Sequence, residues 1–328
     1  MKNKTVNYGR FKILREKIGR NEMMEKFCTG TRGGWKKYEG NPVLGGKYGT
    51  CFDISVLEEG DTIKMYFSWR GEGSIAVTES RDGIHWGIPQ ICIKPRKTQH
   101  GWEDEVNRPI VVKRNGIYHM WYTGQYKPGQ VDGNSYLFYA TSKDGITFTR
   151  MSEEPVMFPD CEWEKVAVMC PHVLWNEEKQ IYQMWYSGGE QYEPTAIGYA
   201  ESGDGYCLKK YAGNPIFMAD PSTAWEQHKA AGCQVIRWNK GYLMFYIGYH
   251  NEDYAQIGMA FSENGVTDWK RSELNPIIAP DPKQFDGEAC YKPYVIHRNG
   301  KWFLWYNGRK EHLEQIGMAV YEGDEIIF

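Results

Sequence analysis

The stretch MWYSGGEQYEPTAIGYAESGDG, from Met184 to Gly205, carries the two signals that decide the fold. It opens with an aromatic run that is typical of a β-strand, and it closes with the tract Ser202-Gly-Asp-Gly205 after a second β-rich run. Asp-Gly supplies the positive φ that a tight hairpin requires. The stretch therefore predicts consecutive antiparallel strands ending in a turn.

The turn tract recurs along the chain at nearly constant spacing. Its general form is Ser-x-Asp/Asn-Gly, and its copies begin at Ser80, Ser142, Ser202 and Ser262, with intervals of 62, 60 and 60 residues. A fixed period of this length is the signature of a repeat architecture. Each tract therefore marks one turn at one place in a repeated unit.

The aromatic run recurs five times, once in each unit. The copies are Met65–Trp69, Met120–Gly124, Met184–Gly188, Met244–Gly248 and Leu304–Gly308. A β-rich run precedes each copy and another follows it, and three units add a fourth run that ends in Glu-Pro or Asn-Pro. Four antiparallel strands form one blade, and blades repeated around an axis form a β-propeller.

The two ends of the chain complement one another. The last unit stops without a fourth strand, whereas Trp35–Leu44 (WKKYEGNPVL) matches the fourth strand Leu208–Phe217 (LKKYAGNPIF) nearly residue for residue. We therefore expect an all-β fold: a five-bladed β-propeller of four-stranded antiparallel blades, closed by the N-terminal strand, which completes the last blade and removes an open edge. Residues 35–328 would form this single domain and residues 1–34 an N-terminal arm. A stacked solenoid would instead need polar capping repeats, which neither end shows.

Composition narrows the class of partner. The 39 basic and 42 acidic residues give a net charge of −3, which does not indicate a nucleic-acid binder. No apolar run reaches the roughly 18 residues that span a bilayer, and the basic, polar start of the chain is unlike a signal peptide. The eight cysteines lack C-x-x-C spacing, so we expect free thiols in the cytoplasm and neither a metal nor a cofactor. The aromatic content of 15% suits sugar binding.

A ligand site is expected at one mouth of the central channel. In a four-stranded meander, the start of the first strand and the loop after the second strand lie at the same end. These positions differ from unit to unit and are mostly polar or charged, which favours a functional site over a structural one. The expected substrate-binding residues are Arg70, Asn107, Arg108, Gln125, His172, Tyr192, Tyr249, Tyr291, Lys292 and Arg309, around Asp53.

At these positions the chain resembles the five-bladed glycoside hydrolase superfamily, which includes invertase-like and arabinanase-like enzymes and the β-mannoside phosphorylases. Invertase-like enzymes carry Asn-Asp-Pro, Arg-Asp-Pro and Glu-Cys-Pro in their first three blades. The matching places here hold Phe52-Asp53-Ile54, Asn107-Arg108-Pro109 and Met169-Cys170-Pro171. The resemblance implies that Asp53 is an essential carboxylate and that two of the usual acids have been replaced.

Two explanations of how the chain could act without the missing acid remain open. Another carboxylate could take its place: Glu190, on the loop after the second strand of the third unit, or Glu105, just ahead of Arg108. Alternatively, the cluster of basic residues could hold phosphate or an acidic sugar, since guanidinium groups match such oxygens in pairs.

The sequence thus predicts a carbohydrate-active enzyme that cleaves a glycosidic bond, as a glycoside hydrolase or a phosphorylase. Its substrate would be a small sugar or an oligosaccharide, with phosphate as a possible second ligand. The alternative is a carbohydrate-binding propeller without catalysis, which would keep the pocket and lose the acids.

Overall fold

The computed structural model describes residues 30–192 and 194–328, and most of the expected arm, residues 1–34, lies outside this part of the chain. The regular secondary structure of the described residues is almost entirely β, which confirms the all-β prediction. Within residues 30–192 and 194–328 there are three single-turn 3-10 helices: η1 (Gly46–Tyr48), η2 (Arg70–Glu72) and η3 (Glu162–Glu164). No helix within the described ranges is long and apolar enough to cross a membrane.

Five antiparallel meanders follow one another along the chain. Their first strands are β3 (Cys51–Glu59), β7 (Glu105–Arg114), β11 (Ala167–Asn176), β16 (Lys229–Trp238) and β21 (Ala289–Arg298). Their second strands are β4 (Thr62–Trp69), β8 (Ile117–Tyr126), β12 (Ile181–Gly189), β17 (Gly241–Tyr249) and β22 (Lys301–Lys310). Their third strands are β5 (Ser74–Ser80), β9 (Asn134–Ser142), β13 (Pro194–Ser202), β18 (Ala255–Ser262) and β23 (Leu313–Glu322).

The outer strands are short. They are β6 (Gln90–Ile93), β10 (Thr149–Arg150), β14 (Lys209–Lys210) with β15 (Phe217–Met218), β19 (Lys270–Arg271) with β20 (Ile278–Ala279), and β2 (Lys36–Lys37). The outer strand of the fifth meander comes from the start of the chain, because Lys36 pairs with Val320 and Lys37 with Ala319. This is the predicted pairing of residues 35–44 with the strand around Ile316–Val320. β1 (Gly30–Thr31) pairs with β20, so these two residues join the sheet of the fourth meander.

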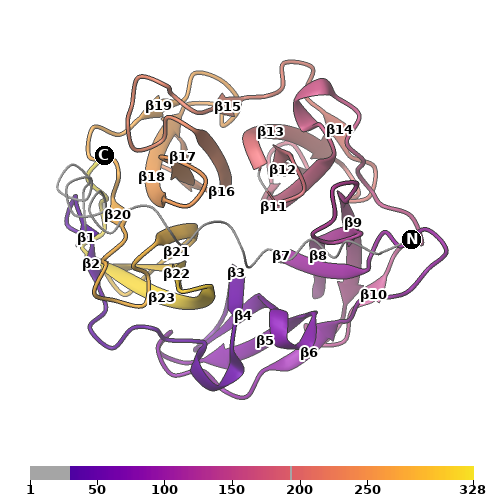
Figure 1. Ribbon diagram of the computed structural model, residues 1–328, viewed down its shortest axis with the longest axis horizontal. Helices are drawn as coiled ribbons and strands as arrows, with labels where there is room; N and C mark the ends of the chain where they lie inside the picture. The colour runs from indigo at the N-terminus through magenta and orange to yellow at the C-terminus, as the bar shows by residue number, and fades with distance from the viewer. Residues whose placement is uncertain (1–29, 193) are drawn as a thin grey trace, which may run out of the picture.

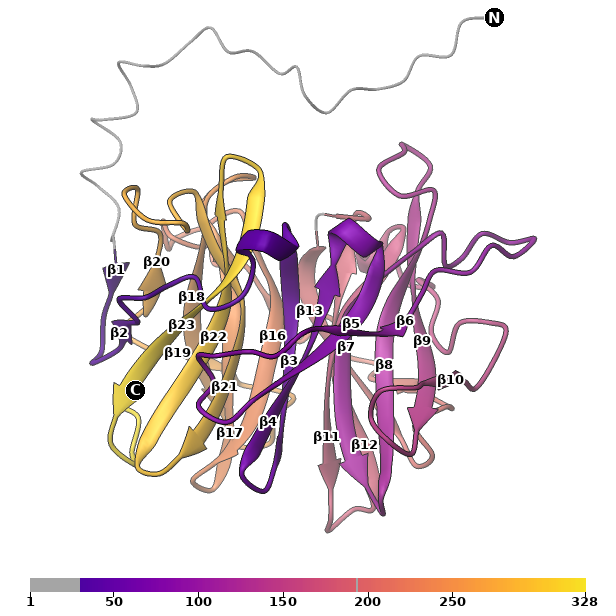
Figure 2. The same ribbon diagram turned by 90° about the horizontal axis from the view of Figure 1, so that it is seen from below.

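The meanders lie around a common axis with their first strands innermost (Figure 1). Each first strand contacts the next one along the chain, and β21 contacts β3. Figure 2 shows the strands running along this axis, with the helical turns η1 and η2 at one end. The apolar core lies mainly between neighbouring meanders, as where Tyr66 and Val77 of the first pack with Val111 and Met120 of the second.

The repeated turns make hydrogen bonds between neighbouring meanders. In each tract the serine hydroxyl accepts the N–H of the glycine, as Ser80 Oγ does from Gly83 at 2.9 Å. The carbonyl of that glycine in turn accepts a hydrogen bond from an aromatic side chain on the second strand of the preceding meander. These bonds are Trp121 to Gly205, Trp185 to Gly265, Tyr66 to Gly145 and, from the fifth meander to the first, Trp305 to Gly83. The turn residues therefore fix both the hairpin and the contact between neighbours.

The fourth strands are interrupted, which differs from the continuous runs expected from the sequence. At the Asn-Pro step the chain leaves the strand, and the asparagine side chain replaces the lost backbone pairing. Asn214 accepts from the N–H of Tyr199 at 2.8 Å and donates to its carbonyl at 3.0 Å. Asn41 makes the same two bonds to Met318, at 2.8 and 2.9 Å. The start of the chain thus reproduces the outer strand of the third meander in detail.

A buried carboxylate anchors the outer strand in four meanders. Asp286 is fully buried, accepts from the Tyr306 hydroxyl at 2.8 Å, and pairs with Lys37 of β2 at 2.6 Å. Equivalent carboxylates pair with basic residues of the other outer strands: Glu103 with Arg150, Glu164 with Lys210 and Glu226 with Arg271. This repetition indicates a structural role, since a buried charge requires a partner.

Replacing Lys37 by methionine should therefore destabilise the fold. The substitution leaves the buried Asp286 carboxylate without its cation, which typically costs about 3–5 kcal/mol. Urea unfolding should show this loss, whereas Lys36→Met, at the exposed neighbouring position, should leave the free energy of unfolding nearly unchanged. Equal stabilities of the two variants would contradict the assigned role.

Candidate active site

A β-bulge interrupts each of the five first strands near the same end. The pairing register shifts there, for example between Phe52 and Ser55 in β3 and between Tyr291 and Tyr294 in β21. One residue in each bulge has a left-handed backbone conformation. These residues are Asp53 (φ 58°), Arg108 (φ 54°), Cys170 (φ 52°), Gly232 (φ 49°) and Lys292 (φ 54°). Such a conformation costs a non-glycine residue about 1–3 kcal/mol, and strain of this kind clusters at functional sites.

Hydrogen bonds to the neighbouring meander hold three of the five bulges in place. The Arg108 N–H donates to Ser68 Oγ at 2.9 Å, and the Gly232 N–H donates to Ser187 Oγ at the same distance. The Asp53 N–H donates to Asn307 Oδ1 at 3.2 Å. In each case the acceptor lies on the second strand of the preceding meander, so the bulge depends on contact between meanders.

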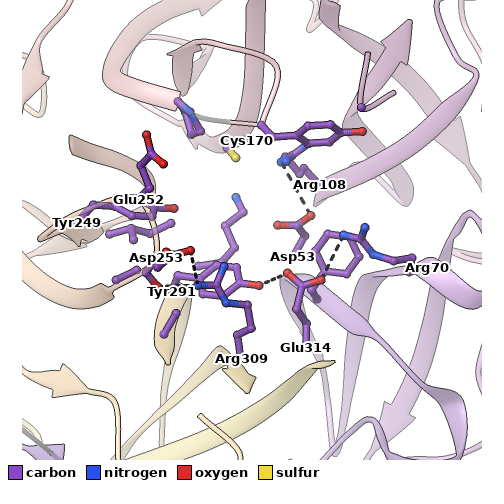
Figure 3. Close-up of a pocket in the computed structure, with 18 residues that line it drawn as sticks. Asp53, Arg70, Arg108, Cys170, Tyr249, Glu252, Asp253, Tyr291, Arg309 and Glu314 are labelled. Atoms are coloured by element: carbon purple, nitrogen blue, oxygen red, sulfur yellow. Dashed lines mark hydrogen bonds and ion pairs between the residues drawn. The ribbon is translucent and has the colours of Figure 1, made fainter. Parts of the chain in front are cut away.

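A cavity of about 520 Å³ opens at this end of the axis. Four basic residues and four acidic residues line it. The basic residues are Arg70, Arg108, Lys292 and Arg309, and the acidic residues are Asp53, Glu252, Asp253 and Glu314. Tyr192, Tyr249 and Tyr291 contribute aromatic walls (Figure 3). The cavity is therefore charged but balanced, with a few apolar surfaces between the charges.

Asp53 occupies the floor of this cavity and is 4% exposed. Its Oδ2 accepts from Ser68 Oγ at 3.2 Å and lies 4.0 Å from Arg108 Nε. Burial alone would lower the pKa of the Arg108 guanidinium, but the Asp53 carboxylate and the other acidic groups nearby together more than offset this effect, so that pKa is raised. Arg108 is therefore a permanent cation beside Asp53.

Glu314 joins the first and fifth meanders at the wall of the cavity. Its Oε1 accepts a hydrogen bond from the Tyr291 hydroxyl, and its Oε2 lies 3.2 Å from Arg70 Nη2. The Arg70 guanidinium also lies over the Phe52 ring, 4.7 Å from its centroid. Figure 3 shows Glu314, Tyr291 and Arg70 on the same side of the cavity as Asp53.

The two remaining basic residues differ in their partners. Arg309 Nη2 donates to the Asp253 carbonyl at 2.6 Å, and Arg309 Nε lies 3.6 Å from Glu288. Lys292 is 6% exposed, and no described residue hydrogen bonds or pairs with its ammonium group. A buried cation without a partner in a cavity is costly and indicates a ligand that carries negative charge.

The cavity brings together eight of the thirteen predicted site residues. They are Asp53, Arg70, Arg108, Tyr192, Tyr249, Tyr291, Lys292 and Arg309. Asn107 and Gln125 do not line it but support it from behind, because Asn107 Oδ1 accepts from Arg108 Nη1 at 2.9 Å and Asn107 Nδ2 donates to Gln125 at 2.7 Å.

Three predicted residues belong elsewhere. Glu190 is more than half exposed, pairs with Lys165 at 3.1 Å, and is not part of the cavity wall. Glu105 accepts from Asn107 at 3.3 Å outside the cavity. His172 is buried and donates from Nε2 to the Val235 carbonyl at 2.7 Å. Burial lowers the pKa of His172 to about 3, so it is neutral and does not join the basic cluster.

The displacement of His172 has a simple geometric reason. It lies two residues after its bulge, and the equivalent side chains point toward the next first strand. Ser55 accepts from the Val111 N–H at 3.1 Å, and Gln234 donates to the Val295 carbonyl at 2.9 Å. This position therefore links neighbouring meanders and does not face the ligand.

Sequence reasoning missed three acidic residues of the cavity. Glu314 opens a third strand, and the prediction considered only first-strand starts and the loops after second strands. Glu252 and Asp253 lie in such a loop, but a few residues beyond Tyr249, which was the only position of this loop that the prediction named. The third strand begins at the same end of the sheet as the loop after the second strand. Including third-strand starts in the prediction would therefore have identified Glu314.

One cluster has ligands suited to a metal ion but is already engaged. Donor atoms of Asp160, Cys161 and Glu164 lie within 4.8 Å of one another. Lys210 pairs with both carboxylates, which supplies the charge that a cation would bring. This cluster belongs to the anchor of the outer strand and lies apart from the cavity.

Known proteins share both sequence and structure with this chain. The family model described as the glycosyl hydrolases family 32 N-terminal domain matches residues 64–204. An uncharacterised protein of Mycobacterium tuberculosis is 27% identical over 278 residues, 80% of this chain and 89% of that protein. A 1,2-β-oligomannan phosphorylase of Thermoanaerobacter sp. is 26% identical over 66% of this chain and 69% of the relative.

Among solved structures, a thermostable family-43 glycoside hydrolase is similar over 85% of this chain and 91% of its own. The TM-score is 0.69 and the sequence identity is 20%. The likeness at this identity concerns the fold, which is an all-β propeller in both proteins.

The hydroxyl that holds the Arg108 bulge should be needed for stability. Ser68→Ala leaves the buried Arg108 N–H without an acceptor, which costs about 1–3 kcal/mol. Ser187→Ala removes the same bond to the Gly232 N–H in another meander and should cost a similar amount in urea unfolding. Full stability of both variants would show that these hydroxyls do not hold the bulges.

Proposed function

We propose that this chain, which resembles the β-propeller glycoside hydrolases and glycoside phosphorylases, is an enzyme that cleaves a glycosidic bond in the cavity around Asp53. The five meanders are its blades, and the pairing of β2 with β23 closes the ring. Residues 35–328 then form one domain with a central channel, and the cavity lies at one mouth of this channel. The contact of β21 with β3 supports this closed arrangement.

Asp53 is the proposed proton donor to the leaving oxygen. Cleavage of a glycosidic bond near neutral pH generally needs a positioned acid. Asp53 is buried, faces the cavity and is oriented by Ser68 and Arg108. The superfamily resemblance of the segment around it supports an essential carboxylate at this position, and the other two usual acids are replaced by Arg108 and Met169.

The unpartnered Lys292 ammonium is the observation that carries the rest of the proposal. Its burial beside Arg108 and Arg309 favours a ligand with anionic oxygens, either inorganic phosphate or an acidic sugar. A phosphorylase among the relatives supports phosphate. The four carboxylates of the cavity leave little excess positive charge, so the anion has to be seated at Lys292 itself.

A carbohydrate-binding propeller without catalysis is the second candidate. It would use the same cavity, the tyrosine walls and Asp53 as a hydrogen-bond acceptor. The two functions differ in what Asp53 contributes, because an acid acts on turnover whereas an acceptor acts on affinity.

Replacing Asp53 by asparagine separates these functions. We expect turnover of oligosaccharides by phosphorolysis or hydrolysis to fall by about 10²–10⁴-fold, the usual contribution of a general acid. Binding of the same sugar, followed by calorimetry, should persist. Loss of affinity in Asp53→Asn, with no detectable turnover by the wild-type protein, would favour the binding module.

Anions should stabilise the protein through Lys292. Phosphate or glucuronate at about 100 times its dissociation constant should add roughly 2.7 kcal/mol to the free energy of unfolding by linkage. Thermal melting should detect the rise in Tm, and Lys292→Met should abolish it. Lys240→Met, at an exposed hairpin turn, is the matched control. A rise in Tm that survives in Lys292→Met would place the anion elsewhere.

A further inference from the structure

Tyr291 and Glu314 form a hydrogen-bonded pair inside the cavity. Both residues line it, and the Tyr291 hydroxyl donates to Glu314 Oε1. Arg70 holds the other oxygen of Glu314 at 3.2 Å. Glu314 is 16% exposed at its side chain, whereas the Arg70 side chain is 55% exposed, so the bond to Tyr291 is the more shielded of the two contacts. A hydroxyl, a carboxylate and an orienting cation are thus arranged in line.

This arrangement has the form of an activated nucleophile. A catalytic nucleophile is recognised by a base within hydrogen-bond reach and a third group that orients the base. Burial, together with the Glu314 carboxylate, raises the pKa of Tyr291 well above its usual value. The phenol is therefore protonated at neutral pH and needs a base at the moment of attack, which Glu314 is positioned to be.

We propose that Tyr291 is the nucleophile of the enzyme and Glu314 its base, acting on glycosides of sugars that carry a carboxylate. This inference rests on the proposed function and assigns the second half of its chemistry. The Tyr291–Glu314 pair takes the place of the second catalytic carboxylate that was expected from the sequence, because neither Glu190 nor Glu105 lies in the cavity. Sialidases show that a tyrosine can replace the carboxylate nucleophile of a glycosidase.

The two steps balance in atoms and protons. In the first, the Tyr291 oxygen bonds to the anomeric carbon and its proton passes to Glu314, while the glycosidic C–O bond breaks and Asp53 protonates the departing oxygen. In the second, water attacks the anomeric carbon and gives a proton to Asp53, while the tyrosine oxygen leaves and recovers its proton from Glu314. The net reaction is hydrolysis with retention of configuration.

The charges of the cavity favour an acidic sugar as the substrate. A carboxylate nucleophile would repel a carboxylated sugar, whereas a phenol that enters the reaction uncharged avoids this cost. The sugar carboxylate would pair with the unpartnered Lys292, near Arg309. Lys292 then selects sugars that carry a carboxylate, and the Tyr291–Glu314 pair supplies a nucleophile that is uncharged before it attacks them.

A trapping experiment tests the pair directly. The probes are a 2-deoxy-2-fluoro-hexuronosyl fluoride and aryl glycosides of hexuronic acids and of mannose. The wild-type mass should rise by one fluorosugar, located on Tyr291 by peptide mass spectrometry. Tyr291→Phe should not be labelled and should lose turnover by at least about 10²-fold. Glu314→Gln should be labelled more slowly by a similar factor, and Tyr211→Phe, at an exposed tyrosine, should behave as wild type.

Other outcomes separate the pair from the general function. NMR of the wild-type product needs no variant, and retention of the anomeric configuration is expected. Inversion, labelling of Asp53 or Glu314, or full activity of Tyr291→Phe would overturn the nucleophile while leaving glycosidic cleavage in place. A wild-type protein that cleaves none of the probes or oligosaccharides would overturn both proposals.

Discussion

A left-handed residue in each first strand is the constraint on which the site depends. An ordinary strand would alternate its side chains between the two faces of its sheet. The bulge breaks this alternation near the mouth, where Asp53, Arg108 and Lys292 occupy its left-handed position. At Asp53 and Arg108 the backbone N–H of the bulge donates to a side chain of the preceding meander. The chemistry of the mouth therefore rests on contact between blades.

This constraint also explains how one repeat supports unlike side chains. The bulge is a property of the backbone and is nearly the same in all five meanders, with φ between 49° and 58°. Its side chain is free to differ, and it is an acid, a guanidinium, a thiol, a hydrogen and an ammonium in turn. The outer parts of the meanders behave in the opposite way, since their turns, asparagines and buried carboxylates are repeated with the same partners. Positions that repeat stabilise the fold, and positions that differ line the cavity.

The sequence predicted the all-β class and the repeated meanders, and it predicted the basic residues that line the cavity but only one of its four acidic residues. The Ser-x-Asp/Asn-Gly tracts specify their turns through local hydrogen bonds, and the match of residues 35–44 to an outer strand specifies a pairing, so both could be predicted without coordinates. Asp53, Arg108 and Lys292 were predicted to lie together because first-strand starts can be aligned between repeats, and they line one cavity. His172 was misassigned because the bulge changes which face a side chain meets two residues later. Glu314 was missed because it lies at the start of a third strand, a position that the prediction did not consider.

The most direct test of glycosidic cleavage at this mouth is a crystal structure of the Asp53→Asn variant soaked with β-linked disaccharides, one neutral and one carrying a uronic acid. The account predicts the glycosidic oxygen within about 3.2 Å of the side chain at position 53, with any carboxylate of the sugar at Lys292. A disaccharide bound on another surface, or one whose glycosidic oxygen lies beyond the reach of position 53, would contradict it.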